Sequence, residues 1–166
     1  MESPRVNRSE TDALIDASAL WILGDIPVNP VLDAAVDLIV AGTDSAALRE
    51  LAGMSDADDP WEIRAALGRA FDEVGLVMPD AASPETTRLA LRELCALFLH
   101  DRISVRELID RARALAGDTA GSVGAGPLLE IGASLDAGRS TPHQAQLAAI
   151  DWATGYLAGS ASSPEA

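Results

Sequence analysis

The sequence predicts an all-α fold, a single-domain bundle of about seven helices with no sheet. Apolar residues recur at the 3.6-residue spacing of a buried helix face along most of the chain, whereas no stretch alternates long enough to indicate a half-buried strand. Residues that start helices precede these apolar patterns, and glycines often follow them. The 166 residues are 48% hydrophobic but only 4% aromatic, so the core must consist mainly of aliphatic side chains, which favours close-packed helices.

Four segments in the first half of the chain begin near a residue able to cap a helix and end at a glycine. Ser9 with Asp12 resembles a capping box, and an asparagine before Pro30 marks the second start. Asp59 has the most complete signal, because a proline follows it and Glu62 lies three residues later. The predicted helices span residues 9–24, 29–42, 43–53 and 59–75.

The second half of the chain has similar start signals. Ser104 and Glu107 form another capping box, and Thr141 with Pro142 opens the last helix. The segments at 43–53 and 128–137 are short, and the expected total is about seven helices. The predicted helices of this half span residues 83–100, 104–116, 128–137 and 141–158.

These helices are expected to form one domain over residues 9–158. The segment 117–126, "GDTAGSVGAG", predicts a flexible connection that supplies no core, because glycines and small residues dominate it. The ends of the chain, residues 1–8 and 159–166, are predicted to be disordered.

The composition argues against several classes of function. All twelve basic residues are arginines, so a lysine Schiff base, a lysine nucleophile and a phosphate loop ending in Gly-Lys are absent from this sequence. The formal charge of -14 disfavours contact with a nucleic-acid backbone. No apolar run approaches the roughly 18 residues that a spanning helix needs, so we expect no membrane contact and a cytoplasmic location. Cys95, the single cysteine, is predicted to be a buried apolar residue.

Two pairs of carboxylates support one enzyme hypothesis. Asp12 with Asp16, and Asp33 with Asp37, lie four residues apart on two successive predicted helices. If these faces met, the four carboxylates could hold Mg²⁺ or Mn²⁺ and act on a phosphorylated small molecule. The alternative is that they are solvent-facing acids near helix starts, where the helix dipole favours negative charge.

Other cofactor motifs are not supported. The acids before Trp61 do not fit a calcium loop, because Pro60 and Trp61 stand where an oxygen ligand and a glycine are required. His100 and Asp101 form a pair that some helical metal phosphohydrolases use, but the only other histidine, His143, lies downstream and not upstream. We therefore expect no cofactor and no catalytic residue, and a role that is not enzymatic.

The charge is concentrated in the first third of the chain. Residues 1–59 have twelve acids and three arginines, whereas residues 60–117 are nearly balanced, and Arg88, Arg92 and Glu93 are expected to form part of a mixed surface there. The acidic third either keeps the protein soluble or forms a docking face for a basic protein. The residues proposed for such a face are Asp33, Asp37, Asp56, Asp58 and Trp61.

Size, charge and class together resemble small acidic helical proteins that neutralise basic nuclease toxins. The segment "DSAALRELAG" is also similar to a segment of bacterial helical proteins. The first resemblance implies an immunity-like or adaptor role through protein contacts, with an oligomeric state that the sequence leaves open. Within the acidic third, Asp59 is assigned to a helix cap, while Asp56 and Asp58 are expected to have no structural role.

Overall fold

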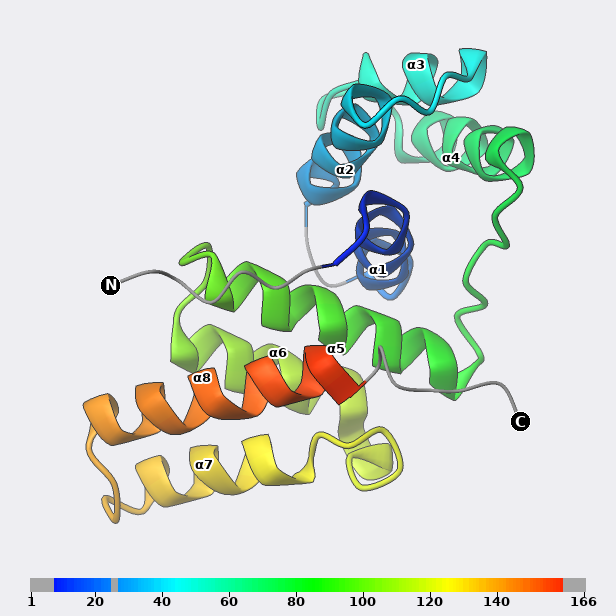
Figure 1. The fold of residues 1–166 in the computed structure, drawn as a ribbon. Coiled ribbons are helices and arrows are strands. Elements are labelled where there is room, and N and C mark those ends of the chain that lie inside the picture. Colours follow the sequence, from blue (N-terminus) through cyan, green and yellow to red (C-terminus); the bar gives the residue numbers. More distant parts are fainter. Residues whose placement is uncertain (1–7, 25–26, 160–166) are drawn as a thin grey trace.

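The structure is a computed structural model of the 166-residue chain that describes residues 8–24 and 27–159. These residues form eight α-helices and one short 3₁₀ helix, with no strand among them, so the predicted all-α class is confirmed (Figure 1). Of the predicted tails, 1–8 and 159–166, residues 1–7 and 160–166 lie outside the described residues, while Gly159 belongs to the last helix. The elements are α1 (Glu10–Ile22), α2 (Asn29–Val40), α3 (Ala46–Ala52), α4 (Pro60–Val74), α5 (Pro84–Leu99), α6 (Val105–Ala116), η1 (Gly117–Thr119), α7 (Gly126–Asp136) and α8 (Pro142–Gly159).

Most predicted helix starts are confirmed by side-chain caps. The Asp59 carboxylate accepts a hydrogen bond from the Trp61 backbone N–H at 2.8 Å. Ser104 and Glu107 make both hydrogen bonds of a capping box. These interactions join residues close in sequence, which is why the sequence pattern predicts them.

Three starts differ from the prediction. The helix α7 begins at Gly126, inside the predicted connection and two residues before the predicted start at 128, and its cap Ala125 makes no side-chain hydrogen bond. The cap of α2 is Val28, with no side-chain hydrogen bond, and Asn29 is already helical. Proline is tolerated throughout a first turn, so an asparagine before Pro30 does not define the boundary to one residue. The cap of α3 is Ser45, whose hydroxyl accepts from the Leu48 N–H, and not a residue at 43 or 44.

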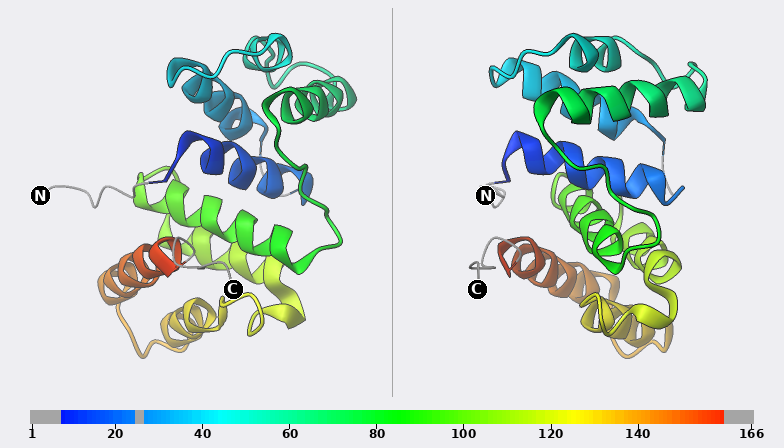
Figure 2. Two further views of the ribbon diagram at one scale, coloured as in Figure 1. Left: turned by 45° about the vertical axis from the view of Figure 1, so that its right-hand side comes forward. Right: turned by 90° about the vertical axis from the view of Figure 1, so that its right-hand side faces the viewer.

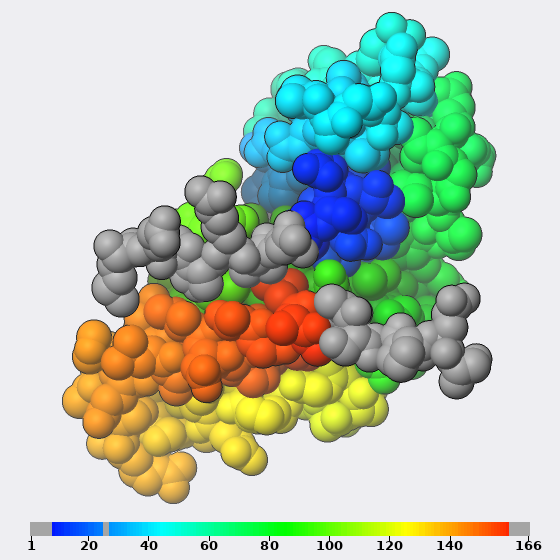
Figure 3. All heavy atoms as spheres, in the orientation of Figure 1, coloured from blue at the N-terminus to red at the C-terminus, as the bar shows by residue number. Residues whose placement is uncertain are grey.

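The helices are stacked in layers with α1 in the middle. The helices α2, α3 and α4 lie on one side of α1, and α5 crosses its other side (Figures 1 and 2). Beyond α5 lie α6, α7 and α8, which form the opposite end of the molecule in the space-filling view (Figure 3). We call α1–α4 the N-terminal half and α5–α8 the C-terminal half.

The core has two clusters of buried side chains, and α1 contributes to both. Leu14 and Ala17 pack with α2, α3 and α4, around residues such as Phe71. Ala19 and Leu20, further along α1, pack with the C-terminal half. Both clusters are mainly leucine and alanine, as predicted, but each layer of helices on either side of α1 has its own cluster.

The glycine-rich segment 117–126 differs from its predicted role, because it contributes to the core. Val123 and Ala125 are buried in the C-terminal cluster. The Tyr156 hydroxyl donates a hydrogen bond to the Val123 carbonyl at 2.7 Å, and Arg88 donates to the Ser122 carbonyl at 2.9 Å. The burial of these two apolar residues and the hydrogen bonds to two backbone carbonyls together attach the segment to α5 and α8.

No helix in the described part of the chain is both long enough and apolar enough to cross a bilayer.

Candidate functional site

A buried network of charges joins the start of the chain, α1 and α5. One nitrogen of Arg8, Nη1, donates to Asp16 at 3.0 Å and to Glu93 at 2.7 Å. The Asp16 carboxylate also accepts from Arg92 Nε at 3.1 Å. The side chains of Asp16 and Glu93 are almost fully buried, and those of both arginines are largely buried. We call these four residues the Arg8 network.

The Arg8 network corrects three expectations. Asp16 does not face solvent, and Arg92 and Glu93 do not belong to a mixed surface. Arg8, at the edge of the predicted tail, packs against both helices. The packing of α1 against α5 explains the difference, because it removes these groups from water and requires each to find an opposite charge.

Burial changes the protonation of the two acids in the network. Loss of hydration raises the pKa of Asp16 from 3.8 to about 6, and the attraction of Arg92 and Arg8 opposes this shift only in part. The pKa of Glu93 is raised for the same reason, against the opposing attraction of Arg8.

The four carboxylates of the metal hypothesis do not form one site. Asp16 is bonded to two arginines, while Asp12 is exposed in the first turn of α1. Asp33 and Asp37 are exposed on α2. Among the residues that the structure describes, no three histidine, cysteine, aspartate or glutamate side chains are placed to hold a metal ion.

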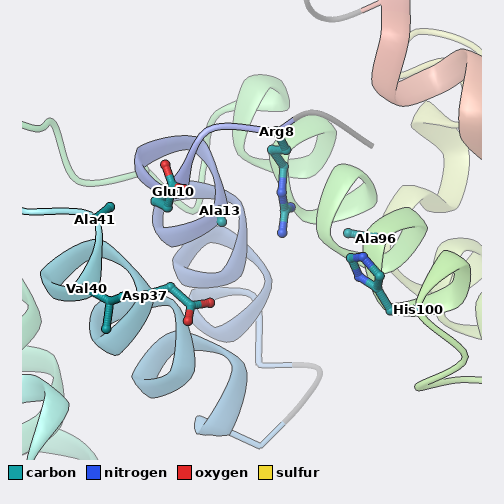
Figure 4. A pocket seen from close by; sticks show the side chains of 8 residues that line it. All are labelled: Arg8, Glu10, Ala13, Asp37, Val40, Ala41, Ala96 and His100. Atoms are coloured by element: carbon teal, nitrogen blue, oxygen red, sulfur yellow. The ribbon is translucent and has the colours of Figure 1, made fainter. Parts of the chain in front are cut away.

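A cleft opens beside the Arg8 network, between α1, α2 and the end of α5 (Figure 4). It has a volume of about 370 Å³ and adjoins a second hollow of about 170 Å³ that shares Arg8, Ala13, Asp37 and His100 in its lining. Arg8 reaches into the space between α1 and α5, with Asp37 on the α2 side and His100 on the α5 side (Figure 4). We call the two hollows together the α1–α2–α5 cleft.

A separate hollow, outside this cleft, lies at the other end of α1 around an exposed tryptophan. Trp61, in the first turn of α4, is 80% exposed. A hollow of about 220 Å³ beside it is lined by Trp21 and Ile22 from the end of α1 and by Pro60, Trp61 and Arg64 from α4. We call these five residues the Trp61 surface. Trp61 is far more exposed than Trp21 and Trp152, which are half-buried.

The acids next to Trp61 have different roles. Asp59 caps α4, as predicted. Asp58 was expected to have no structural role, and this is wrong, because its carboxylate accepts from the Ser55 backbone N–H at 2.7 Å. Such a bond between a turn aspartate and a backbone three residues away is invisible to helix-pattern analysis. Asp56 is exposed and has no hydrogen bond or ion pair with another described residue.

The residues proposed for partner binding therefore belong to two surfaces. Trp61 lines the hollow at the end of α1, with Asp56 and Asp58 in the turn that precedes it, whereas Asp33 and Asp37 line the α1–α2–α5 cleft at the start of α1. Arg8 is not among the site residues predicted from the sequence. One signal was available, because Arg8 is one of only three arginines in the acidic first third, and a lone cation among acids is a natural partner for a buried carboxylate.

Cys95 is fully buried on α5, as predicted. Burial raises the pKa of its thiol, so the reactive thiolate is disfavoured.

No family model matches the chain, and neither the curated proteins nor the solved structures include a significant match to it.

Proposed function

We propose that the protein is a non-catalytic binding protein that contacts a basic partner protein through the Trp61 surface. The exposure of Trp61 is the observation that carries this proposal. Neutralising the partner and adapting it to another protein are two forms of the same role.

The Trp61 surface has the features of a binding hot spot. Tryptophan and arginine are enriched among the residues that supply most of the energy of protein interfaces. Here Trp21, Trp61 and Arg64 surround one hollow, with Ile22 and Pro60 as further apolar lining. A partner that inserts an apolar side chain there would bury much of the 80% of Trp61 that is now exposed to water.

The acidic residues beside the Trp61 surface indicate the sign of the partner's charge. Asp56, Asp58, Asp59 and Glu62 are all exposed and lie within five residues of Trp61 in the sequence. Arg64 is the one charged residue among the described residues that line the hollow, so a lysine or arginine of the partner would bind the neighbouring acids and not the hollow itself. Such complementarity accelerates encounter and excludes acidic partners.

The proposal is tested with Trp61→Ala. Because Trp61 is exposed, we expect the variant to keep the melting temperature of the wild type within a few degrees. Wild type and variant are immobilised and exposed to native lysate of the source organism at low salt. Proteins recovered by the wild type and lost by Trp61→Ala are identified and then purified.

A matched control is Leu147→Ala, which removes an apolar side chain that is 52% exposed on α8. The proposal expects the purified partner to be basic, to bind wild type and Leu147→Ala equally, and to bind Trp61→Ala at least about tenfold more weakly. It also expects high salt to weaken the complex. Equal recovery by all three proteins, or an acidic partner, would refute it.

A further inference from the structure

The α1–α2–α5 cleft is separate from the Trp61 surface, at the other end of α1, and the proposed function does not use it. Its volume of about 370 Å³ lies within the range of small-molecule sites in proteins, and the adjoining hollow extends it. Three helices from both halves of the molecule form its walls (Figure 4).

The charges at the bottom of the cleft are already compensated. Arg8 and Glu93 both line it, and they form an ion pair with each other at 2.7 Å. Asp16 and Arg92 complete the neutral Arg8 network behind them. A ligand therefore meets fixed, rigid charges there that need no further counter-ion.

The margin of the cleft is acidic. Glu10 on α1 and Asp33 and Asp37 on α2 are exposed, and none forms an ion pair or side-chain hydrogen bond with another described residue. Asp33 and Asp37 lie one turn apart on the same face of α2. Among the residues that the structure describes, His100 at the end of α5 and Arg102 just after it are the other ionisable residues in the lining, so the described acids of the margin outnumber the described cations.

The rest of the lining is apolar and small. Ala13, Ala41, Ala96 and Leu97 leave the space open, and Val40 is 80% exposed at its edge. Aliphatic walls with carboxylates at one margin suit a ligand that has a hydrocarbon stem and a positively charged head. An anionic ligand would meet uncompensated carboxylates.

We propose that the α1–α2–α5 cleft binds a small organic cation with an aliphatic stem, either an alkylamine or an alkylguanidine in its protonated form. The Asp33 and Asp37 carboxylates accept hydrogen bonds from the charged head. The stem lies against the alanines and Val40.

The test uses agmatine, which has an amine and a guanidine on one four-carbon stem, titrated into the purified full chain by calorimetry and by amide NMR at low salt. The test variant is the double substitution Asp33→Asn with Asp37→Asn. The control is Asp72→Asn with Asp151→Asn, two exposed acids outside the cleft that change the net charge equally. All four residues are exposed, so both variants should fold, and their melting temperatures verify this.

We expect agmatine to bind the wild type and the control alike, with amide shifts confined to residues around the cleft. The test variant should bind at least about tenfold more weakly, since it loses two hydrogen-bonded charges. 1,4-Butanediol, which has the same stem without charge, should not bind.

Three outcomes would overturn the proposal. The first is that agmatine shows no saturable binding, and the second is that the test and control substitutions weaken agmatine binding equally. The third is that a capped arginine tripeptide binds more tightly than agmatine, which would indicate that the cleft takes a partner's side chain and not a small molecule. Trp61→Ala should bind agmatine as the wild type does, so failure here is distinguishable from failure of the proposed function.

Discussion

Arg8 donates from a single nitrogen to carboxylates on two different helices, Asp16 on α1 and Glu93 on α5. Removing these charges from water costs free energy that their mutual attraction only partly offsets, so the network is not by itself a large source of stability. Removing one member is a different matter, because a charge that stays buried then has less compensation.

We predict that Arg92→Met lowers the free energy of unfolding by about 3–5 kcal/mol at pH 7, because Asp16 loses one of its two cations. Arg69→Met, on α4 at an exposed ion pair with Glu50, should cost about 1 kcal/mol or less. Urea unfolding measures both. The effect of Arg92→Met should shrink at pH 5, where Asp16 is largely protonated, and an equal loss at both pH values would contradict the role of Asp16.

The raised pKa of Asp16 has a defined consequence for stability. Between about pH 4 and 6 the folded protein keeps a proton on Asp16 that the unfolded chain has lost. The contribution of this group to the free energy of unfolding therefore falls as pH rises through that window, and it increases as the solution is acidified from pH 7. Carbon-detected NMR of the Asp16 carboxyl group should give a midpoint near 6. A midpoint below 4 would show that the arginines outweigh burial.

At the scale of elements, helix starts depend on caps of two kinds. Asp59 caps its own helix, α4. The start of α3 is capped in addition by Glu73 from α4, which accepts from the Ala47 N–H at 2.9 Å and from the Ser45 hydroxyl. These hydrogen bonds lower the pKa of Glu73. The contribution of Glu73 to the free energy of unfolding is therefore present at neutral pH and is lost when acid protonates the carboxylate.

We predict that Asp59→Ala lowers the free energy of unfolding by about 1 kcal/mol, because the Trp61 N–H loses its acceptor at the first turn of α4. Asp56→Ala, three residues earlier and without such a bond, should change it by less than about 0.5 kcal/mol. Equal effects in thermal unfolding would show that charge, and not the cap, matters at this turn.

The approach of α7 to α6 depends on Gly132. A Cβ atom at this position would lie 2.6 Å from Ile109 Cγ2, which belongs to a fully buried side chain. We predict that Gly132→Ala lowers the melting temperature, because the clash exceeds the roughly 1 kcal/mol that alanine gains over glycine in a helix. Gly68→Ala on α4, where a Cβ meets nothing within 4 Å, should raise it. Stabilisation by both would mean that α7 can shift at little cost.

At the scale of the whole molecule, α1 connects the two halves. It packs on α2 on one side and on α5 on the other, and it supplies residues to both core clusters. Neither half can bury its apolar surface completely without this helix, so the two should unfold together.

We predict that Leu14→Ala, in one cluster, and Leu20→Ala, in the other, each cost about 2–5 kcal/mol. Hydrogen exchange should then accelerate in both α4 and α6 for either variant, because both clusters share α1. Faster exchange confined to α4 for Leu14→Ala, or to α6 for Leu20→Ala, would show that the two clusters are independent.

Local interactions made much of this protein predictable from its sequence. Helix periodicity, the caps at Ser9, Asp59 and Ser104, and the burial of Cys95 all depend on residues within about four positions of each other or on apolar spacing. The candidate sites were predicted only in part. Asp33, Asp37, Asp56 and Trp61 were identified by residue type and charge, without any indication that they occupy two separate surfaces.

The sequence by itself therefore determined the helices, their caps and the excess of acid. Tertiary structure decided what became of individual charges, because Arg92 and Asp16 are 76 residues apart in sequence, and Arg8 and Glu93 are 85 apart. An aspartate has the same position in a helical pattern whether it meets water or an arginine, and only packing selects between them. The same packing left Trp61 exposed and opened the α1–α2–α5 cleft beside the Arg8 network.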